Sequence, residues 1–230
     1  PPMTPDAGAG RGPRIALIHA TPLAMRPIDQ ALEAGWPQAR RMHLLDDSLS
    51  ADLAEDGTLT PAMVGRFVAL ASYAKATGVG AILFTCSAFG PAIERVASRL
   101  AIPVLKPNEA MFAEALASGR KLGMLATFAP SIPSMEEELE ADARRAGLQV
   151  VLRSLLVPGA LDALAAGRAE EHADRIADAG RGLGDCDAIM LAQFSMAPAA
   201  EALRRVVPQP VLTSPASAVA MLKGRLRAAA

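Results

Sequence analysis

The sequence is poor in the residues and patterns that mark several common protein classes. It has 2 cysteines in 230 residues and no CxxC spacing, which argues against a disulfide framework and a zinc or other metal site. Its formal net charge of −1 gives no electrostatic attraction to nucleic acid or an anionic membrane. No apolar run approaches the ~18 residues of a membrane span, and no glycine-rich phosphate loop is present. We expect a soluble, cytoplasmic globular protein.

Aromatic residues are also scarce, at 3% of the chain, whereas apolar residues together make up 51%. A sizeable core is therefore available, but alanine, leucine, valine and methionine must fill most of it. The opening stretch, residues 1–13 (PPMTPDAGAGRGP), is rich in proline, glycine and alanine and lacks an apolar cluster. This composition predicts a disordered tail ahead of the folded part.

Short apolar runs alternate with amphipathic stretches along the rest of the chain. This alternation is typical of α/β units built around a parallel sheet. Helices are predicted over 60–78, 134–147 and 169–184, and the first and third of these end in glycine, a common helix terminator. The predicted strands are 14–18, 40–45, 80–84, 102–105, 121–126, 149–153, 187–191 and 209–212.

The order of these elements repeats along the chain at one constant offset. Three separate blocks share this offset, which is improbable in a chain of merely generic α/β composition. The aligned pairs are RIALI (14–18) with KLGML (121–125), GAILFTCSAFGPAIE (80–94) with DAIMLAQFSMAPAAE (187–201), and PVL (103–105) with PVL (210–212). We therefore predict an internal duplication of one α/β unit.

The duplication predicts an α/β fold with two pseudo-symmetric lobes, each a mostly parallel sheet flanked by helices. The first lobe covers 14–119 and the second covers 120–230, and an exchange of terminal elements between the lobes is left open. In open α/β sheets, ligands bind beyond the carboxyl ends of the strands. The active site is therefore expected in the cleft between the lobes, lined by residues that follow each strand.

Cys86 ends a predicted buried strand, and Gln193 occupies the equivalent place in the second repeat. Each precedes a predicted helix with proline near its start, so both side chains are expected to face the cleft. The backbone N–H groups that follow Cys86, including those of Ser87 and Ala88, would favour a thiolate or hold a substrate carboxylate. A buried, inert thiol is the alternative. Cys186 maps ahead of a strand, away from the cleft, and is predicted to be structural.

Several segments together resemble the aspartate/glutamate racemase superfamily. They are ILFTCSAFGPAIE, IPVLKPNEAM, LGMLATFAPS, CDAIMLAQFSMA and PVLTSPASAV. That superfamily includes aspartate, glutamate and hydantoin racemases, maleate isomerase and arylmalonate decarboxylase. The resemblance covers nearly the whole chain from about residue 14. It implies a fold of two pseudo-symmetric lobes and acid/base chemistry without a cofactor, performed by cysteine at a carbon next to a carboxylate.

By this resemblance, Cys86 matches the first-lobe catalytic cysteine of the racemases, and Ser87 matches the polar residue that follows it. The second-lobe cysteine falls at Gln193, which departs from the family pattern. A racemase with two bases needs a proton acceptor on one face of the stereocentre and a donor on the other, and an amide cannot titrate. Arylmalonate decarboxylase shows that one cysteine suffices for one-sided chemistry, although its single cysteine lies in the second lobe.

Hydroxyl side chains follow other predicted strands, where they could bind a substrate carboxylate; local capping of turns and helices is the alternative for each. They are Thr127, Ser195, Thr213 and Ser214. His19 ends the first strand, where it could bind substrate or orient and deprotonate Cys86. A hydrogen-bonded histidine without a chemical role is the alternative for His19.

Other polar features are not assigned a specific chemical role. His43 and His172 have no companions in a site-like context. The acidic run MEEELEAD (135–142) is predicted to be a solvated helix face. Lys106 follows a strand and could either bring positive charge to the cleft or pair with Glu109.

Three functional hypotheses follow. The first is a racemase or isomerase that acts on a small carboxylate or amino-acid derivative, with Cys86 as the proton-transfer residue. The second keeps this site but makes the protein a one-base decarboxylase or lyase. The third is a small-molecule binding protein whose catalysis was lost with the second thiol. The expected partner is a small carboxylate, without nucleic acid or membrane, and a homo-oligomer is left open.

Overall fold

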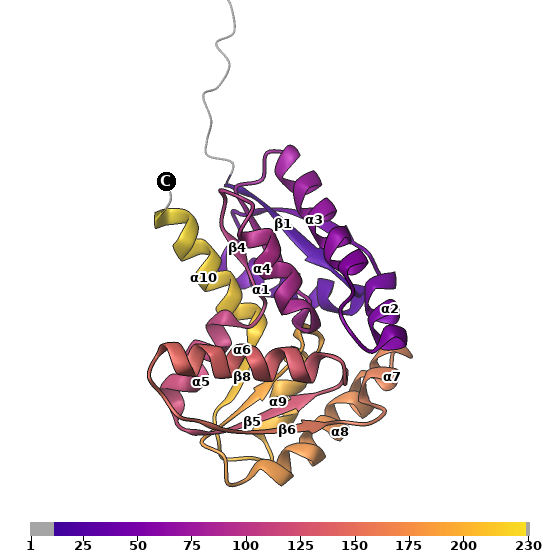
Figure 1. Ribbon diagram of the computed structural model, residues 1–230. Helices are drawn as coiled ribbons and strands as arrows, with labels where there is room; N and C mark the ends of the chain where they lie inside the picture. Colours follow the sequence, from indigo (N-terminus) through magenta and orange to yellow (C-terminus); the bar gives the residue numbers. More distant parts are fainter. Residues whose placement is uncertain (1–11, 229–230) are drawn as a thin grey trace, which may run out of the picture.

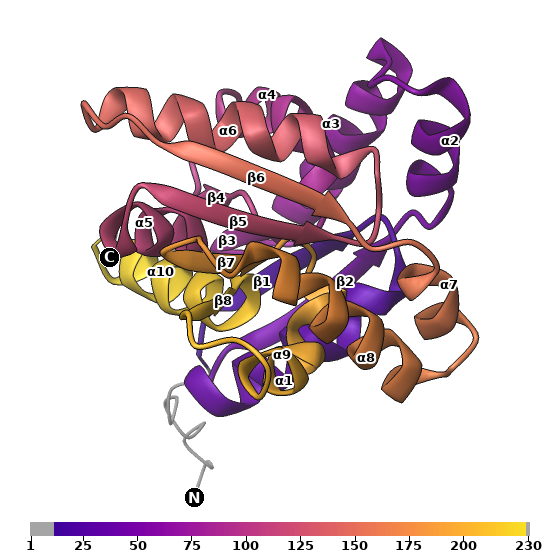
Figure 2. The ribbon, with the colours of Figure 1, turned by 90° about the horizontal axis from the view of Figure 1, so that it is seen from below.

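The computed structural model describes residues 12–228, so most of the predicted disordered tail lies outside the described residues. Its strands form two parallel sheets of four strands each (Figures 1 and 2). The first sheet has the order β2-β1-β3-β4 and the second has the order β6-β5-β7-β8. The first contains β1 (Arg14–His19), β2 (Arg40–Leu45), β3 (Ala81–Phe84) and β4 (Val104–Leu105), and the second contains β5 (Lys121–Ala126), β6 (Val151–Leu156), β7 (Ala188–Leu191) and β8 (Val211–Thr213).

Ten α-helices connect and cover these strands in the described part of the chain. The predicted helices over 60–78, 134–147 and 169–184 are present as α3, α6 and α8. The helices are α1 (Met25–Gly35), α2 (Ser48–Asp56), α3 (Pro61–Ala76), α4 (Gly90–Ala97), α5 (Glu109–Ser118), α6 (Ser131–Arg145), α7 (Ala160–Ala165), α8 (Ala169–Gly180), α9 (Ala200–Arg204) and α10 (Ser214–Ala228).

The predicted strand bounds agree with the structure for the edge strand β2 and, to within one residue, for the central strands β3 and β7. The central strands β3 and β7 are buried along their whole length, as expected for interior strands of parallel sheets. The edge strand β6 has several exposed residues, and it spans 151–156 where 149–153 was predicted. Arg153 interrupts the apolar pattern, but an edge strand tolerates an exposed charged side chain, so the strand continues past it.

The two sheets repeat one topology, which confirms the predicted fold class. The same sequence offset relates the first residues of β1 and β5, of β3 and β7, and of β4 and β8. The register repeats as well, because Ile15 pairs with Ala81 in the first sheet and Leu122 pairs with Ala188 in the second. Only the edge strand β6 begins later than this offset from β2 would place it. Helix α6 accounts for the difference, since it has 15 residues where α1 has 11.

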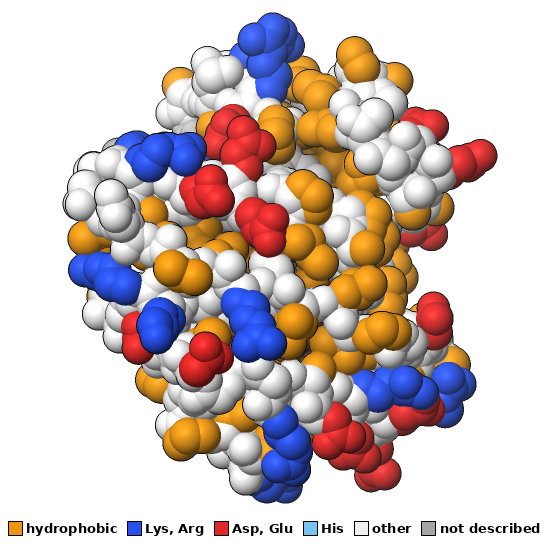
Figure 3. All heavy atoms as spheres, turned by 60° about the horizontal axis from the view of Figure 1, so that its bottom comes forward, with side chains coloured by type: hydrophobic (Ala, Val, Ile, Leu, Met, Phe, Trp, Pro, Cys, Tyr) orange, Lys and Arg blue, Asp and Glu red, His pale blue; other side chains and the backbone are white. Residues whose placement is uncertain are grey.

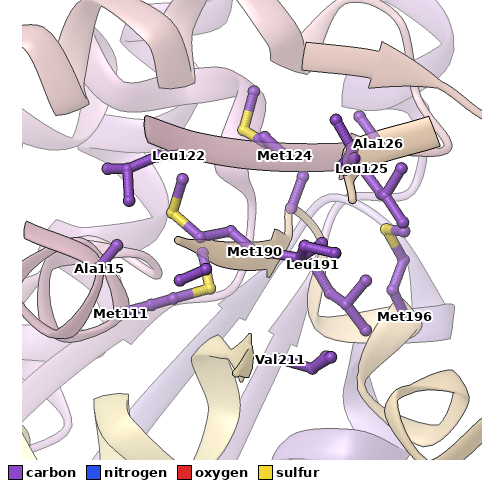
Figure 4. Packing of buried hydrophobic residues seen from close by; sticks show 14 of the residues in the cluster. Met111, Ala115, Leu122, Met124, Leu125, Ala126, Met190, Leu191, Met196 and Val211 are labelled. Carbon is purple, nitrogen blue, oxygen red and sulfur yellow. The ribbon is translucent and has the colours of Figure 1, made fainter. Parts of the chain in front are cut away.

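Helices α5 and α10 pack against the sheet of the opposite half. Met111 and Ala115 of α5 belong to the same buried cluster as Leu122 and Met190 of the second sheet (Figure 4). In return, α10 packs against α1 and β3 of the first half, as its position beside that half in Figure 1 shows. The lobe boundary near residue 119 stays a prediction, but these contacts tie the two halves together.

A close contact between the halves also supports the segment that follows β3. Helix α6 packs against the 3₁₀ turn Ser87–Phe89 and against α4. The Gly90 N–H group lies 3.3 Å from the Ser134 hydroxyl oxygen, its acceptor. A Cβ atom at Gly90 would lie 2.9 Å from that oxygen, so a side chain here would displace the Ser134 hydroxyl from this hydrogen bond.

The surface carries both signs of charge. On the face shown in Figure 3, basic and acidic side chains are interspersed, and hydrophobic side chains gather mainly at the right of the view. Among residues 12–228, no helix combines the length and the apolar character needed to cross a membrane.

Candidate active site

A cavity of about 90 Å³ lies where the carboxyl ends of strands from both sheets meet. This volume is several times what one water molecule needs, so it can take a small organic molecule. Most of its walls come from the segments after β1, β3, β5 and β7, with one residue each from α2 and α7. The lining residues are Ala20, Thr21, Leu23, Ala24, Ser50, Thr85, Cys86, Ser87, Ala88, Phe89, Thr127, Phe128, Leu161, Gln193, Phe194 and Ser195.

Cys86 lies directly after β3 and is 6% exposed. Its thiol donates to the Ile18 carbonyl oxygen at 3.6 Å. Burial raises the pKa of this thiol to about 12, and hydrogen bonds from the Ala20 backbone and from Thr85 oppose the rise. The expected thiolate is therefore wrong for the resting protein, because the loss of hydration outweighs nearby N–H groups. At neutral pH, Cys86 is a thiol and can act as an acid.

Gln193 is held within the second half of the protein. Its side-chain oxygen accepts from the Thr127 backbone N–H at 2.9 Å and from the Thr127 hydroxyl at 3.2 Å. Its amide nitrogen donates to the Ser131 hydroxyl at 2.7 Å. Both ends of the amide are thus engaged, and Gln193 fixes the loop after β5 in relation to the end of β7.

The cavity wall carries no charged side chain among its described lining residues. Cys86 is the only titratable group among them. A carboxylate in this cavity would therefore have to be held by hydroxyls and by backbone N–H groups. Phe89, Phe128, Phe194 and Leu161 supply apolar surface for the rest of a ligand.

The cavity brings together six of the nine predicted site residues. These are Cys86, Ser87, Ala88, Thr127, Gln193 and Ser195. His19, Thr213 and Ser214 do not line it. Ser214 is fully buried and donates to the Asn108 side-chain oxygen at 2.8 Å, so it serves local packing. Cys186 packs in the core of the second half, where its sulfur would be 3.3 Å from a Cβ atom at Gly123.

Lys106 does not bring charge to the cavity. Its ammonium group contacts Glu94 at 2.8 Å and Glu138 at 3.3 Å. The predicted pairing with Glu109 is wrong for the side chain, because Glu109 accepts from the Lys106 backbone N–H instead. Glu138 is 7% exposed, so the prediction of a solvated acidic face fails at this residue. Burial raises the pKa of Glu138 to about 7, although Lys106 opposes the rise.

Thr85 and His43 are polar groups that contact His19, and the sequence analysis did not place them at the site. Thr85 lines the cavity and hydrogen-bonds through its hydroxyl to the ring of His19, at 2.8 Å. The other ring nitrogen of His19 lies 3.0 Å from His43. The available signal was strand adjacency, since His19 and His43 come from neighbouring parallel strands, β1 and β2. Within residues 12–228, no group of three or more His, Cys, Asp or Glu side chains could hold a metal ion.

Solved structures of racemases have similar folds. Glutamate racemase RacE1 from Bacillus anthracis matches 96% of this chain and 84% of its own, with a TM-score of 0.72 and 14% identity. Aspartate racemase from Picrophilus torridus matches 94% of this chain and 95% of its own, with a TM-score of 0.70 and 14% identity. Allantoin racemase from Pseudomonas fluorescens matches 94% of this chain and 92% of its own, with a TM-score of 0.63 and 17% identity.

A search of curated protein sequences finds no significant match to this chain. In contrast, the family model for Asp/Glu/Hydantoin racemase matches residues 15–225. This match spans both sheets and every segment that lines the cavity. The chain therefore belongs to the Asp/Glu/hydantoin racemase family.

Proposed function

We propose that this protein is a racemase or isomerase that transfers a proton at the carbon next to a carboxylate of a small acid or amino-acid derivative. Cys86 is the acid/base group. The observation that carries this proposal is that Cys86 is the only titratable side chain among the residues lining a cavity between two duplicated sheets. The names of the glutamate and aspartate racemases among the structural neighbours support the substrate class.

The cavity supplies the other parts that such a reaction needs. Hydroxyls of Ser87 and Ser195, with the backbone N–H groups after β3 and β7, would hold the carboxylate. The apolar walls would exclude water from the reacting carbon. On one face of that carbon, the Cys86 thiolate would then remove a proton or the Cys86 thiol would protonate the carbanion.

A one-base decarboxylase or lyase is the second candidate, and two observations favour it. Gln193 cannot carry a proton, and both ends of its amide are already engaged in hydrogen bonds. In addition, the raised pKa of Cys86 keeps it protonated, and forming its thiolate at pH 7 costs roughly 7 kcal/mol. A resting acid suits a reaction in which loss of carbon dioxide forms the carbanion and the thiol only has to protonate it.

Deuterium incorporation tests these candidates together. The purified protein is incubated in D2O with glutamate, aspartate, allantoin and a series of 2-substituted malonates, and the products are followed by NMR and chiral analysis. We expect at least one acid to gain deuterium at the carbon next to its carboxylate, and release of carbon dioxide would identify the decarboxylase.

The Cys86→Ala variant should lose this activity by about 10²–10⁴-fold, whereas Cys186→Ala should retain it. Binding of acids without exchange, racemisation or decarboxylation would reject both enzymes and leave a binding protein. Equal activity in the Cys86→Ala variant would show that the thiol is not the acid/base group.

A further inference from the structure

A row of hydrogen-bonding side chains connects the neighbourhood of Cys86 to the protein surface. His19 Nδ1 lies 2.8 Å from the Thr85 hydroxyl oxygen, and His19 Nε2 lies 3.0 Å from His43 Nδ1. His43 Nε2 in turn lies 3.3 Å from a carboxylate oxygen of Asp29. His19 is fully buried, whereas the side chains of His43 and Asp29 are 25% and 32% exposed. The row therefore begins at the cavity wall and ends in contact with solvent.

The sheet topology places these residues in order. Thr85 follows β3, His19 is the last residue of β1, and His43 lies in β2. Because the strand order is β2-β1-β3, the row crosses three neighbouring strands near their carboxyl ends. Asp29 belongs to α1, which packs on one face of this sheet against β1 and β3. The two imidazole rings are nearly parallel, with planes 14° apart.

We propose that Thr85, His19 and His43 form a proton relay between the Cys86 thiol and the protein surface. This inference rests on the proposed function, because it assigns a route for the proton that Cys86 gains or loses. His43 and His19 touch no part of the cavity, so they are positioning and relay residues.

One transfer step balances all protons. The Cys86 S–H group turns from the Ile18 carbonyl oxygen, its acceptor in this structure, to the hydroxyl of the adjoining Thr85, which already hydrogen-bonds the sulfur. Its proton moves to the Thr85 oxygen while the Thr85 hydroxyl proton moves to His19 Nδ1. At the same time the proton on His19 Nε2 moves to His43 Nδ1. The result is a Cys86 thiolate and a His43 imidazolium, with Thr85 and His19 neutral as before. The reverse step reloads the thiol.

The surroundings of each relay residue suit this step. Burial lowers the pKa of His19 to about 4, and this ring stays neutral in both states because only its tautomer changes. The Asp29 carboxylate can only accept hydrogen bonds, so it keeps a proton on His43 Nε2 and stabilises the imidazolium. Arg41 shares this carboxylate oxygen at 2.8 Å and also contacts Glu33.

The relay gives the thiol a route to solvent that does not pass through the cavity. Only 6% of Cys86 is exposed, and a bound substrate would fill the small cavity and keep the remaining water away from it. A hydrogen taken from substrate would then return to the same carbon unless the thiol exchanged it by another path. Through Thr85 and His19, it can exchange while the substrate remains bound.

Paired substitutions separate a relay from a structural role. Thr85→Val removes the hydroxyl at nearly constant shape, and Thr85→Ser retains it. His43→Asn keeps a hydrogen-bonding group near the position of Nδ1 but cannot carry a proton. His172→Asn is the matched control, because His172 is also buried but neither lines the cavity nor contacts the relay, and its ring bonds the Ala160 carbonyl oxygen.

The first readout is hydrogen wash-out from the acid that exchanges in the experiment above. Wash-out should fall by about 10²-fold in Thr85→Val and His43→Asn, and it should stay near the original rate in Thr85→Ser and His172→Asn. The primary isotope effect on wash-out should fall toward one in the first two variants, because the captured proton returns to substrate. A purely structural role would leave His43→Asn active with an unchanged isotope effect.

The second readout needs no turnover. In a Cys186→Ala background, infrared spectroscopy follows conversion of the Cys86 S–H band to S–D after transfer of the protein into D2O, with succinate present to exclude water from the cavity. This conversion should slow by about tenfold or more in Thr85→Val and His43→Asn. An unchanged rate in both variants would overturn the relay, whatever the protein catalyses. Slower conversion in a protein that exchanges no acid would support the relay and reject the proposed function.

Discussion

At the scale of single residues, Gln193 makes the two halves of the duplicated site chemically different. Its amide makes three hydrogen bonds, two of them to Thr127. It therefore stabilises the loop after β5 but offers no proton. The chemistry on the two faces of a bound stereocentre should accordingly be unequal.

Gln193→Cys should raise racemisation relative to exchange of the substrate hydrogen, because it places a titratable group at the end of β7. It should also destabilise the protein by about 1–3 kcal/mol for each buried group that loses its partner. Chiral analysis and NMR in D2O measure the first effect, and urea unfolding measures the second. Gln193→Ala is the control, since it loses the same hydrogen bonds without adding a thiol. An unmodified protein that already racemises as fast as it exchanges would contradict one-sided chemistry.

Cys86 should react with iodoacetamide at a rate that keeps rising between pH 8 and pH 11. The reason is that burial raises the pKa of this thiol to about 12, and the thiolate is the reactive form. Labelling followed by peptide mass spectrometry measures the rate at each cysteine. Succinate should slow the labelling of Cys86, which lines the cavity, and should leave the labelling of Cys186 unchanged. A plateau near pH 9 would show that the pKa of Cys86 is not raised.

At the scale of elements, the contact of α6 with the first half depends on a buried carboxyl group. Glu138 of α6 lies against Lys106, which follows β4, and Glu94 of α4 shares that lysine. Helix α6 also packs on the turn that follows Cys86. The ionisation of Glu138 therefore affects an interface that supports the segment following Cys86.

The free energy of unfolding should fall as pH rises from about 5 to 7 because of this group. Burial raises the pKa of Glu138 from 4.5 to about 7, so the folded protein holds a proton that the unfolded chain releases. Above pH 7 the favourable contribution of the protonated form is lost. Urea unfolding at pH 5 and pH 8 should show a smaller pH-dependent loss for Glu138→Gln than for the original protein. Equal losses in the two proteins would contradict the raised pKa.

At the scale of the whole molecule, the crossing of α5 and α10 couples the two halves. Residues 218, 219 and 222 of α10 lie in the same buried cluster as Ile15, Leu17 and Trp36. A substitution that destabilises α10 should therefore also destabilise the core of the first half. This arrangement favours unfolding of both halves together.

Leu222→Ala should destabilise the protein by about 2–5 kcal/mol, because it leaves a cavity in that shared cluster. Trp36 is the single tryptophan, and its fluorescence reports the first half, whereas far-UV circular dichroism reports both. Both signals should follow one urea transition. Arg227→Ala, at an exposed position of α10, should change stability by no more than about 0.5 kcal/mol. Loss of the fluorescence signal before the dichroism would show that the halves unfold separately.

The sequence determined the repeated α/β order, because apolar runs, turns and helical periodicity are local properties of the chain. The constant offset between the repeats then placed Cys86 and Gln193 at equivalent strand ends. Since ligands bind beyond the carboxyl ends of the strands, and the two repeated units were expected to face one cleft, their presence in one cavity could be predicted. These inferences needed only the order and type of elements.

Only the tertiary structure decided the state and partners of the polar groups. The pKa of Cys86 depends on how completely the surrounding chain removes water from its sulfur. The partners of Gln193 are distant from it in the chain, and His19 meets His43 only because two strands pair in one register. Glu138 is buried because α6 packs on the opposite half. Burial and long-range contacts set these properties, and neither is encoded in the local pattern of any single segment.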